Sequence, residues 1–171
     1  MRQFVFGFIA ALVSIAAAGL GYVALGLAPV ATASPPLPFE KFLTGLALDA
    51  RVKKEAPGSS PIPTSDAAYA AGARIYRSDC AVCHGLPGRD QTAIAKGEFP
   101  KPPELLTGKG VTDDPAGVTY WKVANGIRLT GMPAFSGSLS DEEVWQVSLL
   151  MANADKLPAA VSTALRQPLT Q

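Results

Sequence analysis

The chain has 171 residues, of which 48% are hydrophobic, and its 15 basic and 14 acidic residues leave a formal net charge of +1. This length allows one domain of ordinary size with appendages. A near-neutral chain without a run of basic residues lacks the charge pattern of a nucleic-acid-binding protein, so no nucleic acid is expected among its partners.

The first predicted element is a membrane span. Residues 3–39 include no charged side chain, and Phe4–Ala28 exceeds the roughly 20 residues that a helix needs to cross a bilayer. A cleaved signal peptide is the alternative, because Arg2 supplies a positive start and Ala31-Thr32-Ala33 resembles a cleavage site. The apolar core of a signal peptide is shorter, about 7–15 residues. We therefore interpret residues 1–33 as an uncleaved anchor.

Charge also predicts the orientation of this anchor. Arg2 and the amino terminus favour the cytoplasmic side of the membrane, which places the rest of the chain on the far side. Small residues recur three and four positions apart along one helix face: Gly7, Ala10, Ala11, Ser14, Ala17, Ala18 and Gly21. Such a face lets another helix approach closely, so subunits of a membrane complex are predicted partners, although Gly and Ala are common in spanning helices generally.

Residues 34–64 are predicted to be a linker. The linker begins with the stiff segment Ser34-Pro35-Pro36-Leu37-Pro38 and ends in a Pro-rich and Gly-rich stretch, residues 57–64. Between them, residues 39–56 lack proline and mix apolar with basic side chains: Phe42, Leu43, Leu46 and Leu48 beside Lys41, Arg51, Lys53 and Lys54. This pattern predicts a short amphipathic helix at the membrane surface, against a partner, or exposed as a linker helix.

The globular part is predicted over residues 65–157 and is all-α. Thr64 or Ser65 can cap a first helix that runs to about Ser78. Residues 85–110 have the Gly and Pro content of a loop, and no strand alternation is long enough for a sheet.

Two further helices follow that loop. Asp114 and Pro115 begin a short helix that Gly126 ends. Ser140 and Glu143 form a capping box at the start of the last helix, ahead of an apolar stripe. Residues 158–171 are predicted to be a loosely ordered tail.

The chemistry of the chain is concentrated in Cys80-Ala81-Val82-Cys83-His84, which holds both cysteines and the only histidine. Each thiol can add to one porphyrin vinyl group while the imidazole reaches the iron, so the pattern predicts one covalently attached haem c. A structural zinc site needs four N or S ligands, and only three are present. A thioredoxin-like site would lie in a strand and helix setting that is not apparent here. A plain disulfide leaves His84 unexplained.

A second iron ligand is predicted at Met132. With Met1 as the initiator and no second histidine, the choice lies between Met132 and Met151. Met151 falls on the apolar face of the last helix, where methionine usually fills the core. Met132 lies between Gly131 and Pro133 in a loop that can aim its side chain at a fixed point.

Three segments together resemble the class I cytochrome c family over residues 65–157: Cys80-Ala81-Val82-Cys83-His84, Thr130-Gly131-Met132-Pro133-Ala134-Phe135, and the helix that begins Ser140-Asp141-Glu142-Glu143-Val144-Trp145. The resemblance implies that the first and last helices cross around one haem, with Gly72 and Tyr76 meeting Trp145 and Leu149. It also implies that a proline carbonyl accepts a hydrogen bond from the proximal histidine. Pro103, in Pro103-Glu104-Leu105, matches the family pattern, with Pro102 as a competitor.

Three more residues are predicted to surround the haem, as walls or propionate contacts: Tyr120, Trp121 and Arg128, which flank the Met132 loop. Ordinary core or surface duty is the alternative for each. Over residues 65–157, nine basic and eleven acidic residues give a net charge of −2. This charge argues against docking through a ring of lysines and favours a modest apolar contact with redox partner proteins, or permanent assembly through the anchor.

The expected function is one-electron transfer, without enzymatic activity of its own, by a membrane-anchored monohaem cytochrome c. It would act as a subunit or tethered carrier of a respiratory or dehydrogenase chain. The resemblance also implies a bacterial protein whose haem domain lies in the periplasm, which agrees with the orientation that the charge predicts. One alternative is a haem-based small-ligand sensor or peroxidase-like enzyme with a labile methionine ligand. Another is a structural subunit whose haem only stabilises the fold.

Overall fold

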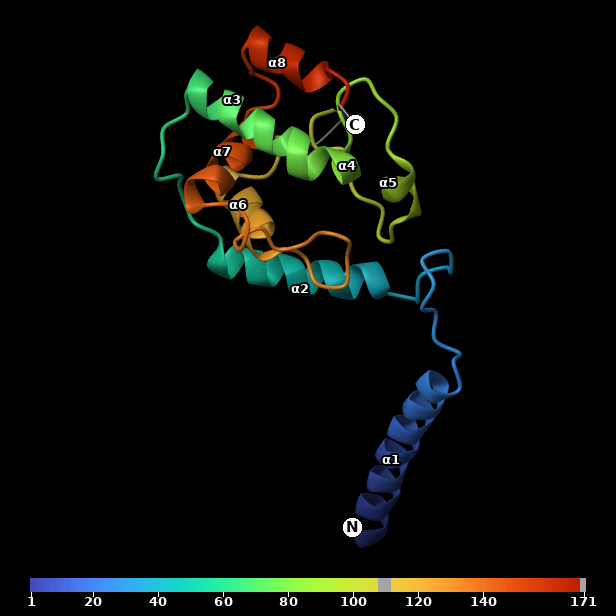
Figure 1. Cartoon of the computed structure of the whole chain (residues 1–171). Helices are drawn as coiled ribbons and strands as arrows, with labels where there is room; N and C mark the ends of the chain where they lie inside the picture. The colour runs from blue at the N-terminus through green and yellow to red at the C-terminus, as the bar shows by residue number, and fades with distance from the viewer. Residues whose placement is uncertain (108–111, 170–171) are drawn as a thin grey trace. The chain divides into compact units, whose positions relative to one another are not determined.

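The computed structural model describes residues 1–107 and 112–169, and within these ranges the chain forms helices and loops without a strand (Figure 1). The predicted all-α fold is confirmed. The chain divides into two compact units, Met1–Glu40 and Lys41–Gln171. The first unit contains α1 (Arg2–Ala24), which is long and apolar enough to cross a membrane, a property that N-terminal signal sequences share.

The helices beyond α1 are short. In chain order they are α2 (Glu40–Glu55), α3 (Asp66–Ile75), the π-helical turn η1 (Tyr76–Cys80), α4 (Ala81–His84), α5 (Ala93–Gly97), α6 (Ala116–Asn125), α7 (Asp141–Ala152) and α8 (Ala159–Arg166). The region predicted as a loop from Gly85 to Gly110 therefore contains α5; residues 108–110 of that prediction, and Val111 after them, lie outside the described residues.

Local capping explains where several helices begin. The Ser65 side chain accepts a hydrogen bond from the Ala68 N–H at the start of α3, and Thr92 does the same for Ala95 in α5. At α7 the capping box between Ser140 and Glu143 is complete in both directions. These bonds satisfy N–H groups that have no partner within the helix.

The helices α3 and α7 approach each other closely at Gly72. A Cβ atom at Gly72 would overlap the Gln146 carbonyl group and lie 3.1 Å from the Leu150 Cβ. Gly72 therefore meets Gln146 and Leu150, one position along α7 from the predicted Trp145 and Leu149. The Trp145 ring instead stacks on Tyr120 of α6, with ring centroids 4.2 Å apart.

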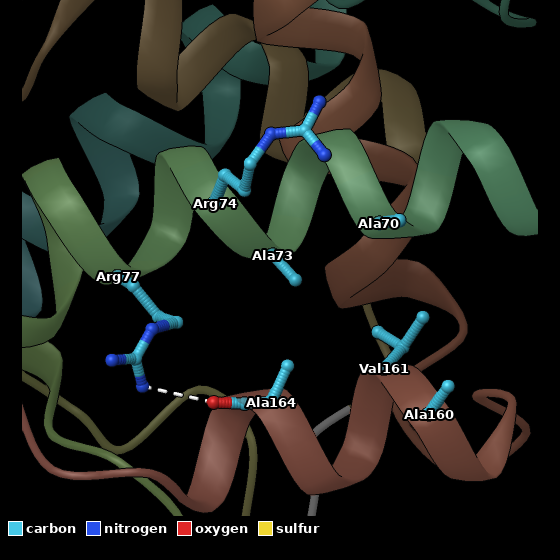
Figure 2. A pocket seen from close by; sticks show the side chains of 7 residues that line it. All are labelled: Ala70, Ala73, Arg74, Arg77, Ala160, Val161 and Ala164. Carbon is cyan, nitrogen blue, oxygen red and sulfur yellow. Dashed lines mark hydrogen bonds between the residues drawn. The ribbon is translucent and has the colours of Figure 1, made fainter.

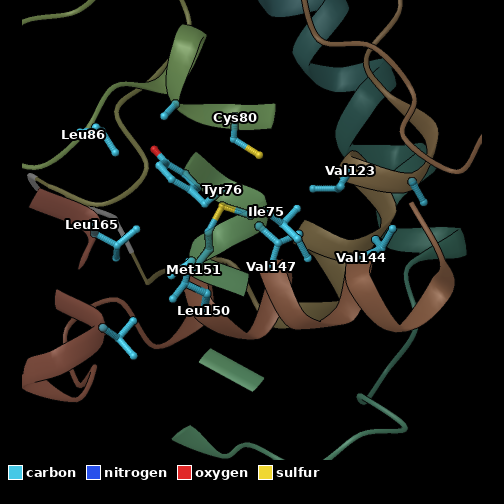
Figure 3. Close-up of a cluster of buried hydrophobic side chains, with 14 residues drawn as sticks. Ile75, Tyr76, Cys80, Leu86, Val123, Val144, Val147, Leu150, Met151 and Leu165 are labelled. Carbon is cyan, nitrogen blue, oxygen red and sulfur yellow. The ribbon is translucent and has the colours of Figure 1, made fainter. Parts of the chain in front are cut away.

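A buried apolar cluster lies among α3, η1, α6, α7 and α8 (Figure 3). Its members include Tyr76 and Cys80 of η1, Val123 of α6 and Met151 of α7, and the Met132 side chain packs against it. The thiol of Cys80 is thus part of the hydrophobic core, which gives this cysteine a fixed position.

The C-terminal segment is more ordered than the sequence predicted. Residues 158–171 were expected to be a loose tail, but α8 buries Val161 and Leu165 in the core cluster. The Arg77 guanidinium donates to the carbonyl oxygens of Ala164, Gln167 and Pro168 at 2.9, 2.7 and 2.9 Å. Figure 2 shows Arg77 reaching across from the α3 side to the end of α8. The prediction was wrong because these partners come from distant parts of the chain.

The helix α2 packs against other parts of the second unit. Val52 is buried, and the Trp121 Nε1 of α6 donates to Glu55 Oε2 at 3.1 Å. A Cβ atom at Gly117, in the first turn of α6, would overlap the Pro57 carbonyl oxygen, so the chain after α2 lies directly on α6. The compact unit accordingly begins at Lys41, although the predicted start of the cytochrome domain is residue 65.

Candidate haem site

The helical path from α3 through η1 to α4 positions the two cysteines and His84. Cys80 ends η1 and is buried, while Cys83 and His84 end α4. Gly85 stops the helix with a φ of 77°, a conformation that glycine adopts without steric cost. The buried Tyr76 hydroxyl donates to the Gly85 carbonyl oxygen at 2.9 Å and fastens the end of the motif to η1.

The His84 ring is oriented by a backbone carbonyl. His84 Nδ1 lies 2.8 Å from the Pro103 carbonyl oxygen. Because a carbonyl oxygen can only accept, Nδ1 carries the proton in this bond and Nε2 keeps its lone pair. The adjacent Pro102 carbonyl instead accepts from Gln91 Nε2 at 3.1 Å. Of the two prolines that the sequence left open, Pro103 is the one beside His84.

Both thiols are kept in their neutral form. Burial, with smaller contributions from Asp79 and Cys83, raises the pKa of the Cys80 thiol to about 12. Burial and the Glu98 carboxylate raise the pKa of Cys83. Reactive redox cysteines and zinc ligands need a stabilised thiolate, and among the described residues no cluster of three or more His, Cys, Asp or Glu side chains could hold a metal ion.

The pKa of His84 is also lowered. Burial is the main cause, and the Pro103 carbonyl and the Glu98 carboxylate act in the opposite direction. The neutral imidazole that results is the form that can donate a lone pair to a metal.

The Met132 loop is fastened to the end of α6. Phe135 N–H donates to the Val123 carbonyl at 3.0 Å, and Ile127 N–H donates to the Met132 carbonyl at 3.2 Å. The Met132 N–H donates to the Thr130 hydroxyl at 3.1 Å. Gly126 has a φ of 66°, and a Cβ atom there would lie 2.9 Å from the Met132 carbonyl oxygen. The backbone conformation and the close approach of the Met132 loop therefore both require glycine at this position.

The two methionines lie in different surroundings. Met151 is only 5% exposed and belongs to the core cluster. Met132 is half-buried on its loop and packs against the same cluster from outside. A thioether on a fixed loop can serve as a ligand, whereas one enclosed by the core has a packing role.

The three predicted haem neighbours lie in different surroundings. The Tyr120 hydroxyl donates to Asp141 at the start of α7, and its ring stacks on Trp145. Trp121 donates to Glu55 of α2. Arg128 is exposed on the loop that leads to Met132. The polar atoms of Tyr120 and Trp121 are therefore engaged with α7 and α2.

Sequence reasoning missed Glu98, which lies between the cysteine motif and the Met132 loop. Cys83 Sγ donates to Glu98 Oε1 at 3.3 Å. On the other side, a Cβ atom at Gly131 would lie 2.6 Å from Glu98 Oε2. No local pattern marks this residue, because its position depends on two segments that are distant in the sequence.

The residues present fit a haem of the c type. Two neutral thiols three positions apart, an imidazole with only Nε2 available, and a thioether on a fixed loop form the donor set of that group. An all-helical domain that presents this donor set defines a c-type cytochrome.

Comparison with known proteins agrees. Residues 67–151 match the family described as cytochrome C oxidase, cbb3-type, subunit III. A cytochrome c6 of Limnospira maxima is 33% identical over 79 residues, which cover 46% of this chain and 84% of the relative. The chain belongs to the class I c-type cytochromes, whose haem and iron serve electron transport.

Two other matches are to longer proteins. A thiosulfate dehydrogenase of Stutzerimonas stutzeri (strain A1501) is 34% identical over 116 residues, 65% of this chain, and the chain spans only 36% of its length. A solved chain of a Kuenenia stuttgartiensis reducing HAO-like protein complex is 27% identical, with a TM-score of 0.48; the match covers 56% of this chain and 47% of that one.

Proposed function

We propose that this protein is a membrane-anchored monohaem cytochrome c that carries single electrons within a respiratory or dehydrogenase chain on the periplasmic side of a bacterial membrane. The observation that carries the proposal is the His84 geometry: Nδ1 is 2.8 Å from the Pro103 carbonyl, which leaves Nε2 as the ligand atom beside the two cysteines. The chain holds one such motif, so one haem is proposed.

Each residue of the site has a distinct role in this proposal. Cys80 and Cys83 would hold the porphyrin through thioether bonds, and His84 and Met132 would bind its iron. The bound haem supplies a one-electron Fe(III)/Fe(II) couple. Pro103 holds the Nδ1 proton and the ring orientation of His84. The apolar side chains around Cys80 exclude water, and the Met132 thioether favours a higher reduction potential than a second histidine would.

The anchor is the second part of the proposal. Retention of α1 would hold the haem domain at the membrane, and its face of small residues would pack on a subunit of a larger complex. In such a complex the protein acts as the haem subunit of an oxidoreductase. The similarity to a thiosulfate dehydrogenase supports a role as the haem subunit of such a complex, in which the catalytic site belongs to another part of the assembly.

The test is purification from membranes, followed by intact mass and a reduced-minus-oxidised absorption spectrum. We expect one covalent haem, residues 1–33 still present, and the weak absorption band that a methionine–iron bond produces at the red edge of the spectrum. A chain without covalent haem would overturn the proposal. Covalent haem without the band would instead favour a ligand-binding or peroxidase-like protein with an open iron site.

A further inference from the structure

The helix α2 has two apolar faces of different character. The first, the Val52 face, contains Gly45, Leu48 and Val52 and continues to Ala56 just after the helix. These residues are spaced three and four positions apart, and each is at least half-buried. Val52 is 5% exposed, and the neighbouring Glu55 accepts the bond from Trp121. This face packs α2 against the rest of the second unit.

The other face begins in the first turn and carries large side chains into solvent. Phe42, Leu43 and Leu46 are 65%, 60% and 58% exposed. At about 100° per residue these three positions fall within a single arc of roughly 100°, away from the arc of Val52. Three large apolar side chains together on one helix face are more than the scattered exposure of an ordinary surface.

We propose that this Phe42 face, defined by Phe42, Leu43 and Leu46, lies in the lipid headgroup and acyl boundary of the membrane that α1 spans. The inference rests on the proposed retention of α1. Only residues 25–39 separate the end of α1 from the start of α2. Fifteen residues reach at most about 50 Å when fully extended. Membrane lipid is therefore always within reach of α2.

The charges near the Phe42 face suit a lipid surface. The helix carries four basic and three acidic residues, and two of the basic ones, Lys53 and Lys54, follow the face in the last turn. Interfacial helices combine aromatic and leucine side chains with flanking lysines, which pair with lipid phosphates. The Val52 face would then fix the haem domain to a membrane-bound helix, so that the domain is held near the surface and does not swing on a loose tether.

The test uses the full-length haem protein in nanodiscs of phosphatidylcholine with a minor share of phosphatidylglycerol. Single nitroxide labels are placed by Phe42→Cys and Leu46→Cys on the face, with Arg51→Cys as the matched control on the same helix. Leu12→Cys reports on α1. The native cysteines are blocked as thioethers, and intact mass verifies one haem and one label. The measurement is the accessibility of each label to oxygen, which concentrates in lipid, and to a water-soluble nickel complex.

We expect the labels at positions 42, 46 and 12 to be several-fold more accessible to oxygen than to the nickel complex. The label at position 51 should be more accessible to the nickel complex. If the labels at positions 42 and 46 are as accessible to the nickel complex as the label at position 51, while the label at position 12 lies in lipid, the inference is overturned. The proposed membrane anchor is then still supported. Labels shielded from both reagents would mean a protein partner and would also overturn it. A water-accessible label at position 12 would reject the anchor itself, and the inference with it.

Discussion

One hydrogen bond decides which nitrogen of His84 can act as a ligand. Pro103 accepts from Nδ1, and the pKa of the ring is lowered mainly by burial. The carbonyl and the burial act on different properties: the first selects the tautomer and the second keeps the ring neutral. In the proposed site the imidazole would therefore bind iron without rearrangement, which suits a centre that changes its charge with little movement.

Met132 offers the sharpest test at the residue scale. Met132→Ala removes the proposed thioether ligand, so the red-edge absorption band should disappear and the reduction potential should fall. Absorption spectroscopy and a redox titration of the full-length protein measure both effects.

Met151→Ala is the matched control for that experiment. This thioether belongs to the core cluster, so its loss should leave the band in place and reduce the free energy of unfolding by about 2–5 kcal/mol. The opposite pattern, with the band lost in Met151→Ala and kept in Met132→Ala, would exchange the roles of the two methionines.

The sequence alone predicts the role of a residue when the residues that define that role are close together in the chain. One segment of five residues holds Cys80, Cys83 and His84, so a haem-attachment motif can be predicted from the sequence without knowledge of the fold. Glu98 gives no such signal, because contacts with Cys83 and Gly131 define its place. Tyr120 shows the same limit: its stacking on Trp145 depends on how α6 packs against α7.

At the scale of elements, Gly72 controls how closely α3 approaches α7. Gly72→Ala would place a methyl group on the Gln146 carbonyl, which is backbone and cannot turn aside. We expect the free energy of unfolding to fall by about 1–3 kcal/mol as the helices separate. Gly45→Ala is the control, since nothing lies within 4 Å of its new methyl group, and it should be neutral or stabilising by up to about 1 kcal/mol. Equal effects in denaturant titrations would contradict this account.

The capping box of α7 predicts a pH dependence. The Ser140 N–H and hydroxyl bond the Glu143 carboxylate and lower its pKa below the ordinary 4.5. A carboxylate with a lowered pKa in the folded state stabilises the protein above the unfolded value and loses that effect as the pH falls through the folded value. Wild type should therefore exceed Glu143→Gln in stability at neutral pH, and the gap should close below pH 4.5. A gap that stays constant as the pH falls would refute this role.

The same scale shows which elements the sequence predicts. The start of α7 is encoded within four residues by Ser140 and Glu143, and it is found where the sequence predicted. The order of α8 depends on Arg77 and on the core cluster, which lie far away in the chain. Val161 and Leu165 lie four positions apart on one face of this short helix, but the core that covers that face comes from distant parts of the chain.

For the whole molecule, the core of the second unit and the haem should stabilise each other. Small domains bury a limited apolar area, and here Cys80, the proposed haem attachment residue, is itself part of the core cluster. We expect the full-length Cys80→Ala/Cys83→Ala chain, which cannot attach haem, to lose a stability comparable to the roughly 5–15 kcal/mol of an ordinary domain. Such a chain should keep much of its helical circular dichroism but lose the fixed environment of its aromatic rings and its cooperative melting.

The native sequence produced without haem attachment is the control that separates haem from mutation. It should melt like the double variant, because both lack the same group. If either form melts cooperatively at the temperature of the haem protein, the core is complete without the cofactor. The haem would then be an addition to a finished fold, and the burial of Cys80 would reflect packing alone.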